Sequence, residues 1–91
     1  MTEKQKAKEG LLYDANYDEE LKKERIKCKE LCYEYNMLNP TQMEKREELL
    51  KKIIGKTADG FLIEPNFYCD YGYNIEFGKN FYSNHNLVIL D

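Results

Sequence analysis

Residues 60–91, GFLIEPNFYCDYGYNIEFGKNFYSNHNLVILD, contain two ladders of residues that recur every six positions. The first ladder is apolar and comprises Ile63, Cys69, Ile75, Phe81 and Leu87. The second comprises the residue types that most readily take a positive φ, at Gly60, Asn66, Gly72, Gly78 and Asn84. Each six-residue unit thus offers one inward side chain and one sharp turn. This predicts a solenoid of short strands joined by tight turns, with an ordinary hairpin over 67–73 as the alternative.

The residues before this stretch have helical spacing instead. Thr2 and Gln5 form a capping-box pattern, and Gly10 is a natural stop for a short helix. A second helix is expected to start within 16–18 and to end in 36–40. Thr41 and Glu44 form another capping-box pattern, which predicts a third helix that ends near residue 55. The apolar residues of both long helices fall on one face, as in a helix that packs on a core.

Composition excludes several classes of protein. The 91 residues suit one small domain, and a net charge of −3 argues against a broad basic surface for nucleic acid. No apolar run is long enough to span a bilayer, and residues 1–5 lack the apolar core of a signal peptide. We therefore expect a soluble, cytoplasmic protein that binds neither nucleic acid nor membranes.

The three cysteines do not suggest a disulfide framework, because their number is odd. Cys28 and Cys32 are about one helical turn apart and could in principle hold a metal. Together with the distant, single His85 they make a poor ligand set, since structural zinc normally takes four ligands. We expect buried free cysteines, Cys69 included, and no metal.

Several longer runs carry a family resemblance: residues 10–16 (GLLYDAN), 32–36 (CYEYN), 63–65 (IEP), 69–75 (CDYGYNI), 78–84 (GKNFYSN) and 88–91 (VILD). The chain resembles the maltose O-acetyltransferase family from about residue 6 to residue 91, and is similar also to galactoside and nodulation-type acetyltransferases. The resemblance implies an α+β fold: a helical cap over 1–58, then the first coils of a left-handed parallel β-helix over 59–91.

The same resemblance implies an enzyme that moves an acetyl group from acetyl-CoA to a sugar hydroxyl, without a metal. Family members are trimers with active sites between subunits, so a homotrimer is expected. They continue for several more coils, which carry the CoA groove and the catalytic histidine. We therefore expect residues 1–91 to be a fragment, truncated at residue 91 and inactive alone.

The repeats here are irregular. Strict hexapeptide repeats carry a small residue four positions after the aliphatic one, and those places hold Lys79, His85 and Asp91. Three hexads make one triangular coil, so residues 74–91 are expected to form the first clear one. His85, the only histidine, stands where the family commonly has an aromatic residue. The catalytic base is therefore expected downstream of Asp91.

The residues expected to contact the acceptor follow from the resemblance. Sugars are held by carboxylates and amides beside an aromatic wall. The matching positions are Asn84, Asp70, Asp14 or Asn16, Arg25, Asp91 and, as the wall, Tyr82.

Each of these residues also has a structural interpretation. Asn84 belongs to the turn ladder, and Asp70 alternates with Cys69 and could be solvated surface. Asp14 and Asn16 could cap the second helix. Arg25 has no acid three or four positions away, so a solvated basic stripe with Lys22 and Lys29 is its alternative. Asp91 could hold the edge of the coil. The tyrosines of the solenoid could stack on sugar or pack under the cap, and they are Tyr68, Tyr71, Tyr73 and Tyr82.

Two other functions stay open at this point. One is a non-catalytic docking or assembly module, although a single coil would leave an open strand edge of the kind that natural proteins cover. The other keeps the fold but changes the acceptor, for instance to a cell-wall amino sugar or an antibiotic.

Overall fold

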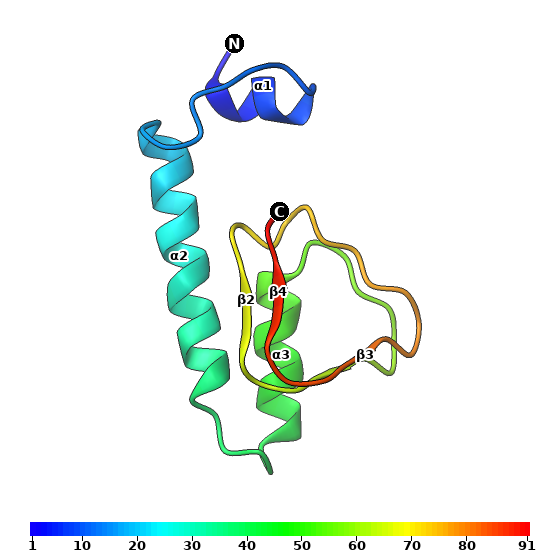
Figure 1. Cartoon of the computed structure of the whole chain (residues 1–91). Coiled ribbons are helices and arrows are strands. Elements are labelled where there is room, and N and C mark those ends of the chain that lie inside the picture. Colours follow the sequence, from blue (N-terminus) through cyan, green and yellow to red (C-terminus); the bar gives the residue numbers. More distant parts are fainter.

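The computed structural model describes residues 1–91, with three helices followed by four short strands (Figure 1). The elements are α1 (Glu3–Lys8), α2 (Glu19–Asn36), α3 (Met43–Ile53), β1 (Leu62–Ile63), β2 (Phe67–Cys69), β3 (Tyr82–Ser83) and β4 (Leu87–Ile89). None of the helices combines the length and apolarity needed to cross a membrane.

The first two helices begin as their sequences predict. At α1 the backbone N–H of Gln5 donates to Thr2 Oγ1 at 3.1 Å, and the N–H of Thr2 donates back to Gln5 Oε1 at 2.8 Å. At α2 the backbone N–H of Leu21 donates to Asp18 Oδ2 at 3.1 Å. Each cap satisfies an N–H that the helix itself leaves unpaired.

The predicted capping box of α3 is wrong. Gln42 occupies the N-cap position and makes no side-chain capping hydrogen bond. Thr41 Oγ1 donates to Asn39 Oδ1 at 2.8 Å, and this local bond competes with capping. The pattern with Glu44 therefore marked the start of the helix to within two residues but gave the wrong cap.

The strands pair in parallel, which excludes the hairpin. Three parallel contacts define the coil: Lys56–Glu76, Leu62–Tyr82 and Phe67–Leu87. In each, a residue lies beside the one 20 positions further along the chain. One turn of the solenoid thus takes 20 residues rather than the 18 of three hexads, and the prediction of a coil over 74–91 is wrong by two residues.

The extra two residues lie in the turn over 70–74. The inward-facing pairs of the first coil are Phe61/Ile63, Phe67/Cys69 and Ile75/Phe77. The first step between these pairs is six residues and the second is eight, and the second contains this turn.

The turn ladder shifts by the same two residues. Gly60 and Gly72 have positive φ values of 78° and 87°, as predicted. Further along, the left-handed conformation passes to Asn80 and Asn86, with φ of 60° and 68°, instead of Gly78 and Asn84. Asn80 and Asn86 are the positions 20 residues after Gly60 and Asn66. The backbone requirement proposed for Asn84 is therefore absent.

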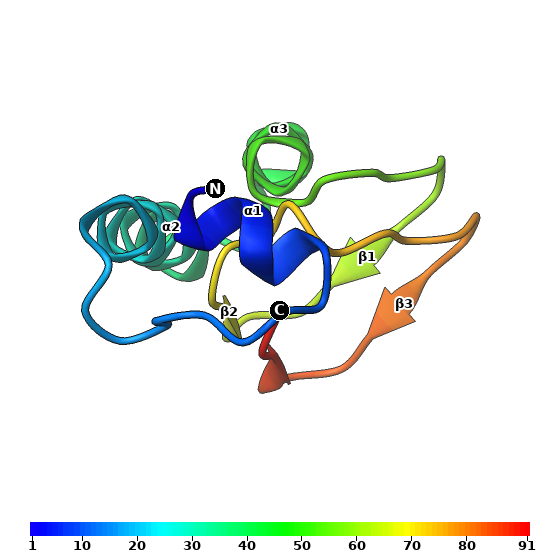
Figure 2. The ribbon, with the colours of Figure 1, turned by 90° about the horizontal axis from the view of Figure 1, so that it is seen from above.

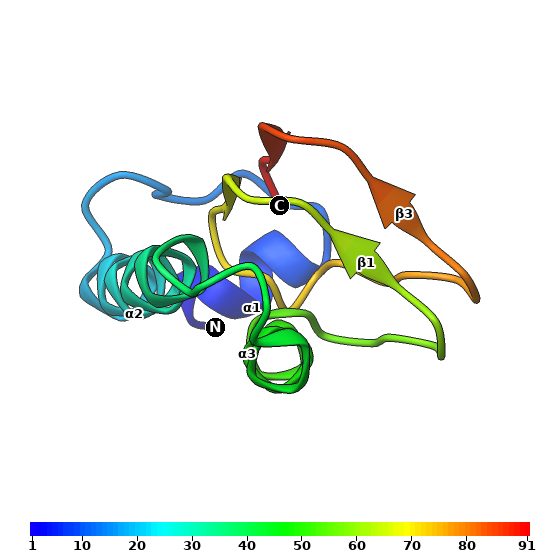
Figure 3. The ribbon, with the colours of Figure 1, turned by 90° about the horizontal axis from the view of Figure 1, so that it is seen from below.

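Helices and coil share one core. Helix α3 lies over the end of the solenoid formed by the first coil, and β3 and β4 lie on the side away from α3 (Figures 2 and 3). Helix α2 runs beside β2, and α1 crosses the end of the molecule near the C-terminus (Figure 1). The buried cluster draws on both parts of the chain: Cys28, Cys32, Tyr35, Leu49, Leu50, Ile53, Ile54, Ile63, Phe67, Cys69, Ile75 and Phe77. Burying a large apolar side chain contributes about 1.5–3 kcal/mol, so this core joins cap to coil.

Buried polar contacts fix the register of the cap on the coil. The Tyr35 hydroxyl and Arg46 Nη2 both donate to the carbonyl of Ile63, the latter at 2.9 Å. Asn36 exchanges two hydrogen bonds with the backbone of Phe67, at 2.9 and 3.1 Å. The Asn36 amide thus pairs with the edge of β2 as a neighbouring strand would.

Candidate functional site

The turn over 70–74 is closed by the carboxylate of Asp91. This carboxylate accepts hydrogen bonds from the backbone N–H groups of Tyr71 at 2.9 Å, Gly72 at 2.7 Å and Asn74 at 3.2 Å. The Asn74 side chain adds a bond to the Asp91 carbonyl at 3.3 Å. Asp91 therefore holds the edge of the coil, which is the structural alternative that the sequence left open.

Arg25 connects this turn to the segment before α2. Its Nη1 donates to the Ala15 carbonyl at 2.6 Å and to the Tyr71 hydroxyl at 2.7 Å, and its Nη2 lies 3.5 Å from the Asn16 carbonyl. Arg25 is half-buried and pairs with no carboxylate. The solvated basic stripe is therefore wrong for Arg25. Two of its five N–H donors, on Nε and Nη2, remain available to a ligand.

Asp14 and Asn16 do not cap α2, because Asp18 does. Asp14 Oδ1 accepts from the N–H of Tyr17 at 3.1 Å and so closes the turn before the helix. Both side chains are exposed. The structure places the Asn16 backbone, not its amide group, against Arg25.

A cleft of about 460 Å³ lies between α1 and the coil turn. It is lined by Lys4, Ala7, Lys8, Tyr13, Leu21, Tyr71, Tyr73, Asn74 and Asp91. The rings of Tyr71 and Tyr73 are 5.4 Å apart, so these two tyrosines pack under the cap. The alternative of packing under the cap is thus confirmed for Tyr71 and Tyr73.

Glu24 sits beside this cleft as a bridging carboxylate. It accepts a hydrogen bond from Lys4 Nζ and another from the Tyr73 hydroxyl, each at 2.6 Å. Burial opposes ionisation of Glu24, but the bonds from Lys4 and Tyr73 outweigh it and lower its pKa. The same carboxylate raises the pKa of Lys4, and it raises that of Tyr73 in addition to burial.

Asp70 is the predicted site residue whose carboxylate is least engaged at this end. It directly follows β2, is half-buried, and its carboxylate makes neither a hydrogen bond nor an ion pair. A half-buried carboxylate without a partner is chemically available to sugar hydroxyls. Its predicted role in acceptor binding stays a prediction.

Tyr82 and Asn84 lie at the other end of β4. Tyr82, on β3, is 60% exposed, and Asn84 is exposed between β3 and β4. Asn84 Oδ1 accepts from the N–H of His85 at 2.8 Å, so its NH₂ group is free to donate. His85 Nδ1 contacts the carbonyl of Pro65, which can only accept, so this nitrogen carries the proton.

The predicted site residues therefore form two groups. Asp14, Asn16, Arg25, Asp70 and Asp91 lie at the end of the coil next to α1, which we call the cap-side end. Tyr82 and Asn84 precede β4 at the opposite end, which we call the open end. Within one copy of the chain the two groups do not converge.

Two contributors to the cap-side end were missed in the sequence. Tyr71 is the partner of Arg25 across 46 positions, and Glu24 reaches Tyr73 across 49. No local signal in the sequence could have shown such distant contacts. The tyrosine-rich composition of 68–73 was the only indication, and it did not name the partners.

Comparison with known proteins identifies the family. Residues 6–58 match the model described as the maltose acetyltransferase hexapeptide capping motif. The chain is 54% identical over 82 residues to "Putative acetyltransferase YJL218W" of Saccharomyces cerevisiae, an alignment covering 90% of this chain and 42% of that protein.

Two solved structures resemble the whole chain. One is a maltose O-acetyltransferase from Clostridium difficile 630, at 44% identity and a TM-score of 0.95, of which this chain covers 48%. The other is a galactoside acetyltransferase in complex with coenzyme A, at 37% identity and a TM-score of 0.89, of which it covers 45%. The chain thus spans about half the length of the proteins that it matches. It belongs to the family of the maltose acetyltransferase hexapeptide capping motif.

Proposed function

We propose that this chain forms the acceptor-binding front part of an acetyl-CoA-dependent sugar O-acetyltransferase. The observation that carries the proposal is the agreement of the whole chain, coil turn included, with a maltose O-acetyltransferase at a TM-score of 0.95. The match of the cap to the family model over residues 6–58 supports it independently of the coil.

The polar groups left unpaired fit a sugar acceptor. Asp70 offers a carboxylate, Arg25 two N–H donors, and Asn84 an NH₂ group. Vicinal hydroxyls both donate and accept, so a mixed set of this kind can orient one hydroxyl for reaction. Tyr82, exposed on β3, supplies an apolar face of the type on which sugar rings stack.

In the proposed reaction the acceptor oxygen attacks the carbonyl carbon of acetyl-CoA. A base takes the proton of the hydroxyl, the carbon–sulfur bond breaks, and the CoA thiolate leaves and is protonated. The residues described here serve to bind and orient the acceptor. We assign the base and the CoA groove to the part of the related proteins that lies beyond the matched half.

The division of the site between two ends of β4 favours a site made by more than one copy. In a trimer, the open end of one subunit, with Tyr82 and Asn84, could face the cap-side end of the next. We propose this homotrimer together with a left-handed sense for the parallel solenoid. Parallel pairing with a constant offset of 20 residues supports a solenoid of this type.

The test is acetyl transfer by the product of the complete reading frame. The protein is incubated with acetyl-CoA and separately with maltose, a β-galactoside, an amino sugar and water alone, and products are identified by mass spectrometry. We expect an O-acetyl sugar with at least one acceptor and none from residues 1–91 alone. Consumption of acetyl-CoA that no sugar accelerates would contradict the proposal and would favour the docking module.

A further inference from the structure

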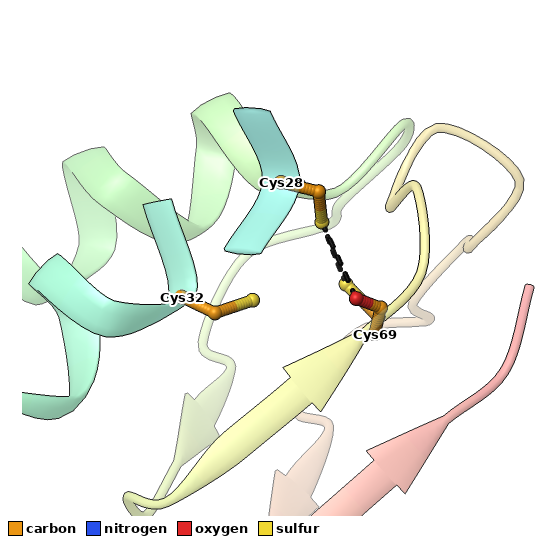
Figure 4. A group of neighbouring side chains, drawn as sticks. All are labelled: Cys28, Cys32 and Cys69. Carbon is orange, nitrogen blue, oxygen red and sulfur yellow. Dashed lines mark hydrogen bonds between the residues drawn. The ribbon is translucent and has the colours of Figure 1, made fainter. Parts of the chain in front are cut away.

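Three buried thiols converge between the cap and the coil, away from the candidate site (Figure 4). Cys28 and Cys32 lie one turn apart on α2, and Cys69 ends β2. Their sulfurs all lie within 4.8 Å of one another, and Cys28 Sγ is 3.4 Å from Cys69 Sγ. Each residue is no more than 5% exposed. The sequence paired Cys28 with Cys32 but could not show that Cys69 joins them.

We propose that Cys28, Cys32 and Cys69 form a binding site for a trivalent thiophilic ion of the arsenite type. The site would take one ion in three-coordinate, all-sulfur geometry. Because the thiols belong to the cap helix and to the coil, the bound ion would also fasten these two parts together.

The spacing of the sulfurs fits such a centre. A bond of about 2.3 Å from the central atom to each sulfur places the sulfurs about 3.5 Å apart in a pyramidal complex and about 4.0 Å apart in a planar one. The distance of 3.4 Å between Cys28 and Cys69 already matches the pyramidal arrangement. Cys32 lies within 4.8 Å of both and needs to shift by about 1.3 Å at most.

The number of ligands excludes the usual zinc arrangement. Structural zinc takes four ligands, and here no histidine or carboxylate joins the three thiols. Water is kept out, since Cys32 is 1% exposed and Cys28 3%. Soft ions that accept three sulfur ligands are the remaining class.

Charge then selects the trivalent member of that class. Three thiolates around copper(I) would leave a net negative charge in an apolar core without a cation to pair it, which is costly. Three thiolates around arsenic(III) give a neutral complex. Arsenous acid and three thiols yield the tris-thiolate and three molecules of water, so atoms and charge balance without an oxidant.

The protonation states of the thiols suit this condensation. Hydrogen bonding with the neighbouring thiols, together with burial, raises the pKa of Cys28 to about 12 and raises that of Cys69. Hydrogen bonds from Cys28 and Cys69 lower the pKa of Cys32. The Cys32 sulfur is thus the first nucleophile to attack arsenic, and the thiol protons leave with the displaced hydroxides as water.

The test is equilibrium binding of arsenite to the reduced protein, followed by mass spectrometry and by counting free thiols. We expect one arsenic per chain, loss of all three titratable thiols, a higher melting temperature, and three sulfur neighbours of arsenic in X-ray absorption. Under the same conditions zinc should bind far more weakly, since it would lack a fourth ligand.

The variants are Cys28→Ala, Cys32→Ala and Cys69→Ala, with Tyr33→Ala, an exposed neighbour on α2, as the matched control. Each cysteine variant should bind arsenite roughly 100-fold more weakly, because a third linked thiol adds that much through its high effective concentration. Circular dichroism shows which variants stay folded. Equal affinity of the wild type and a folded cysteine variant, or two sulfur neighbours in the wild type, would overturn the proposal.

Discussion

The two ends of β4 differ in how their polar groups are used. At the cap-side end the Asp91 carboxylate accepts three backbone N–H groups, and Arg25 and Glu24 each bridge helix and turn. At the open end Asn84 bonds only to its neighbour in sequence, and Tyr82 is 60% exposed. One strand therefore joins a rigid joint to a surface whose polar groups are free. Polar residues at the joint are held by the fold, whereas those at the open end are available for a ligand.

The largest predicted contrast is between two glycines. Gly72, at the joint, has φ +87°, and a Cβ there would overlap the carbonyl of Ile53. Gly78 has no positive φ and faces open space. We expect Gly72→Ala to lower the free energy of unfolding by about 3 kcal/mol or more, and Gly78→Ala to change it by less than about 0.5 kcal/mol. Urea denaturation measures both, and equal effects would show that the turn over 70–74 is not a rigid joint.

A smaller contrast concerns the two polar side chains themselves. Asp91→Ala removes the acceptor of three backbone N–H groups and should cost about 1–3 kcal/mol of stability. Asn84→Ala removes one local bond at an exposed position and should cost less than about 0.5 kcal/mol. Thermal unfolding of the two variants side by side checks this. A greater loss at Asn84 would reverse the assignment of the two ends.

The smallest effect is the pH dependence of α1 at the joint. The folded-state pKa of Glu24 is lowered from 4.5, so its contribution to holding α1 is present above about pH 4.5. The contribution is lost as the pH falls through the lowered pKa, when Lys4 and Tyr73 lose their ionised partner. We expect NMR contacts between Lys4 and Tyr73 to weaken in that range.

Glu24→Gln is the control for this titration, because it keeps the shape of the side chain but cannot ionise. Its contacts between Lys4 and Tyr73 should be weak at neutral pH and independent of pH between 3 and 6, a window set by the ordinary glutamate pKa of roughly 4.3. A wild-type protein whose contacts persist unchanged to pH 2 would show that Glu24 does not hold α1.

Much of the architecture could be predicted from the sequence, because it depends on local signals. The caps at Thr2 and Asp18 satisfy N–H groups a few residues away, and the six-residue ladders indicated a solenoid. The length of the coil could not be predicted. Ile75 continues the ladder and is buried, yet Phe77, two positions later, faces the same side and is buried too. Alternation by two residues therefore concealed an insertion of two.

The candidate site was predictable as residue types but not as an arrangement. Asn84 was placed on the turn ladder, and only the shift of that ladder to Asn80 and Asn86 released it from a backbone role. Arg25 was free of partners in its own helix, as predicted, but its actual partner is 46 positions away. Contacts of this range follow from the packing of cap on coil, which no local pattern encodes.

The central claim is that the open end binds the acceptor. The most direct test is steady-state acetyl transfer by the complete protein carrying Asn84→Ala, with sugar and acetyl-CoA varied in turn. Loss of a ligand hydrogen bond predicts a roughly tenfold higher KM for the sugar, an unchanged KM for acetyl-CoA and unchanged stability. An unchanged KM for the sugar, or a rise confined to acetyl-CoA, would contradict the claim.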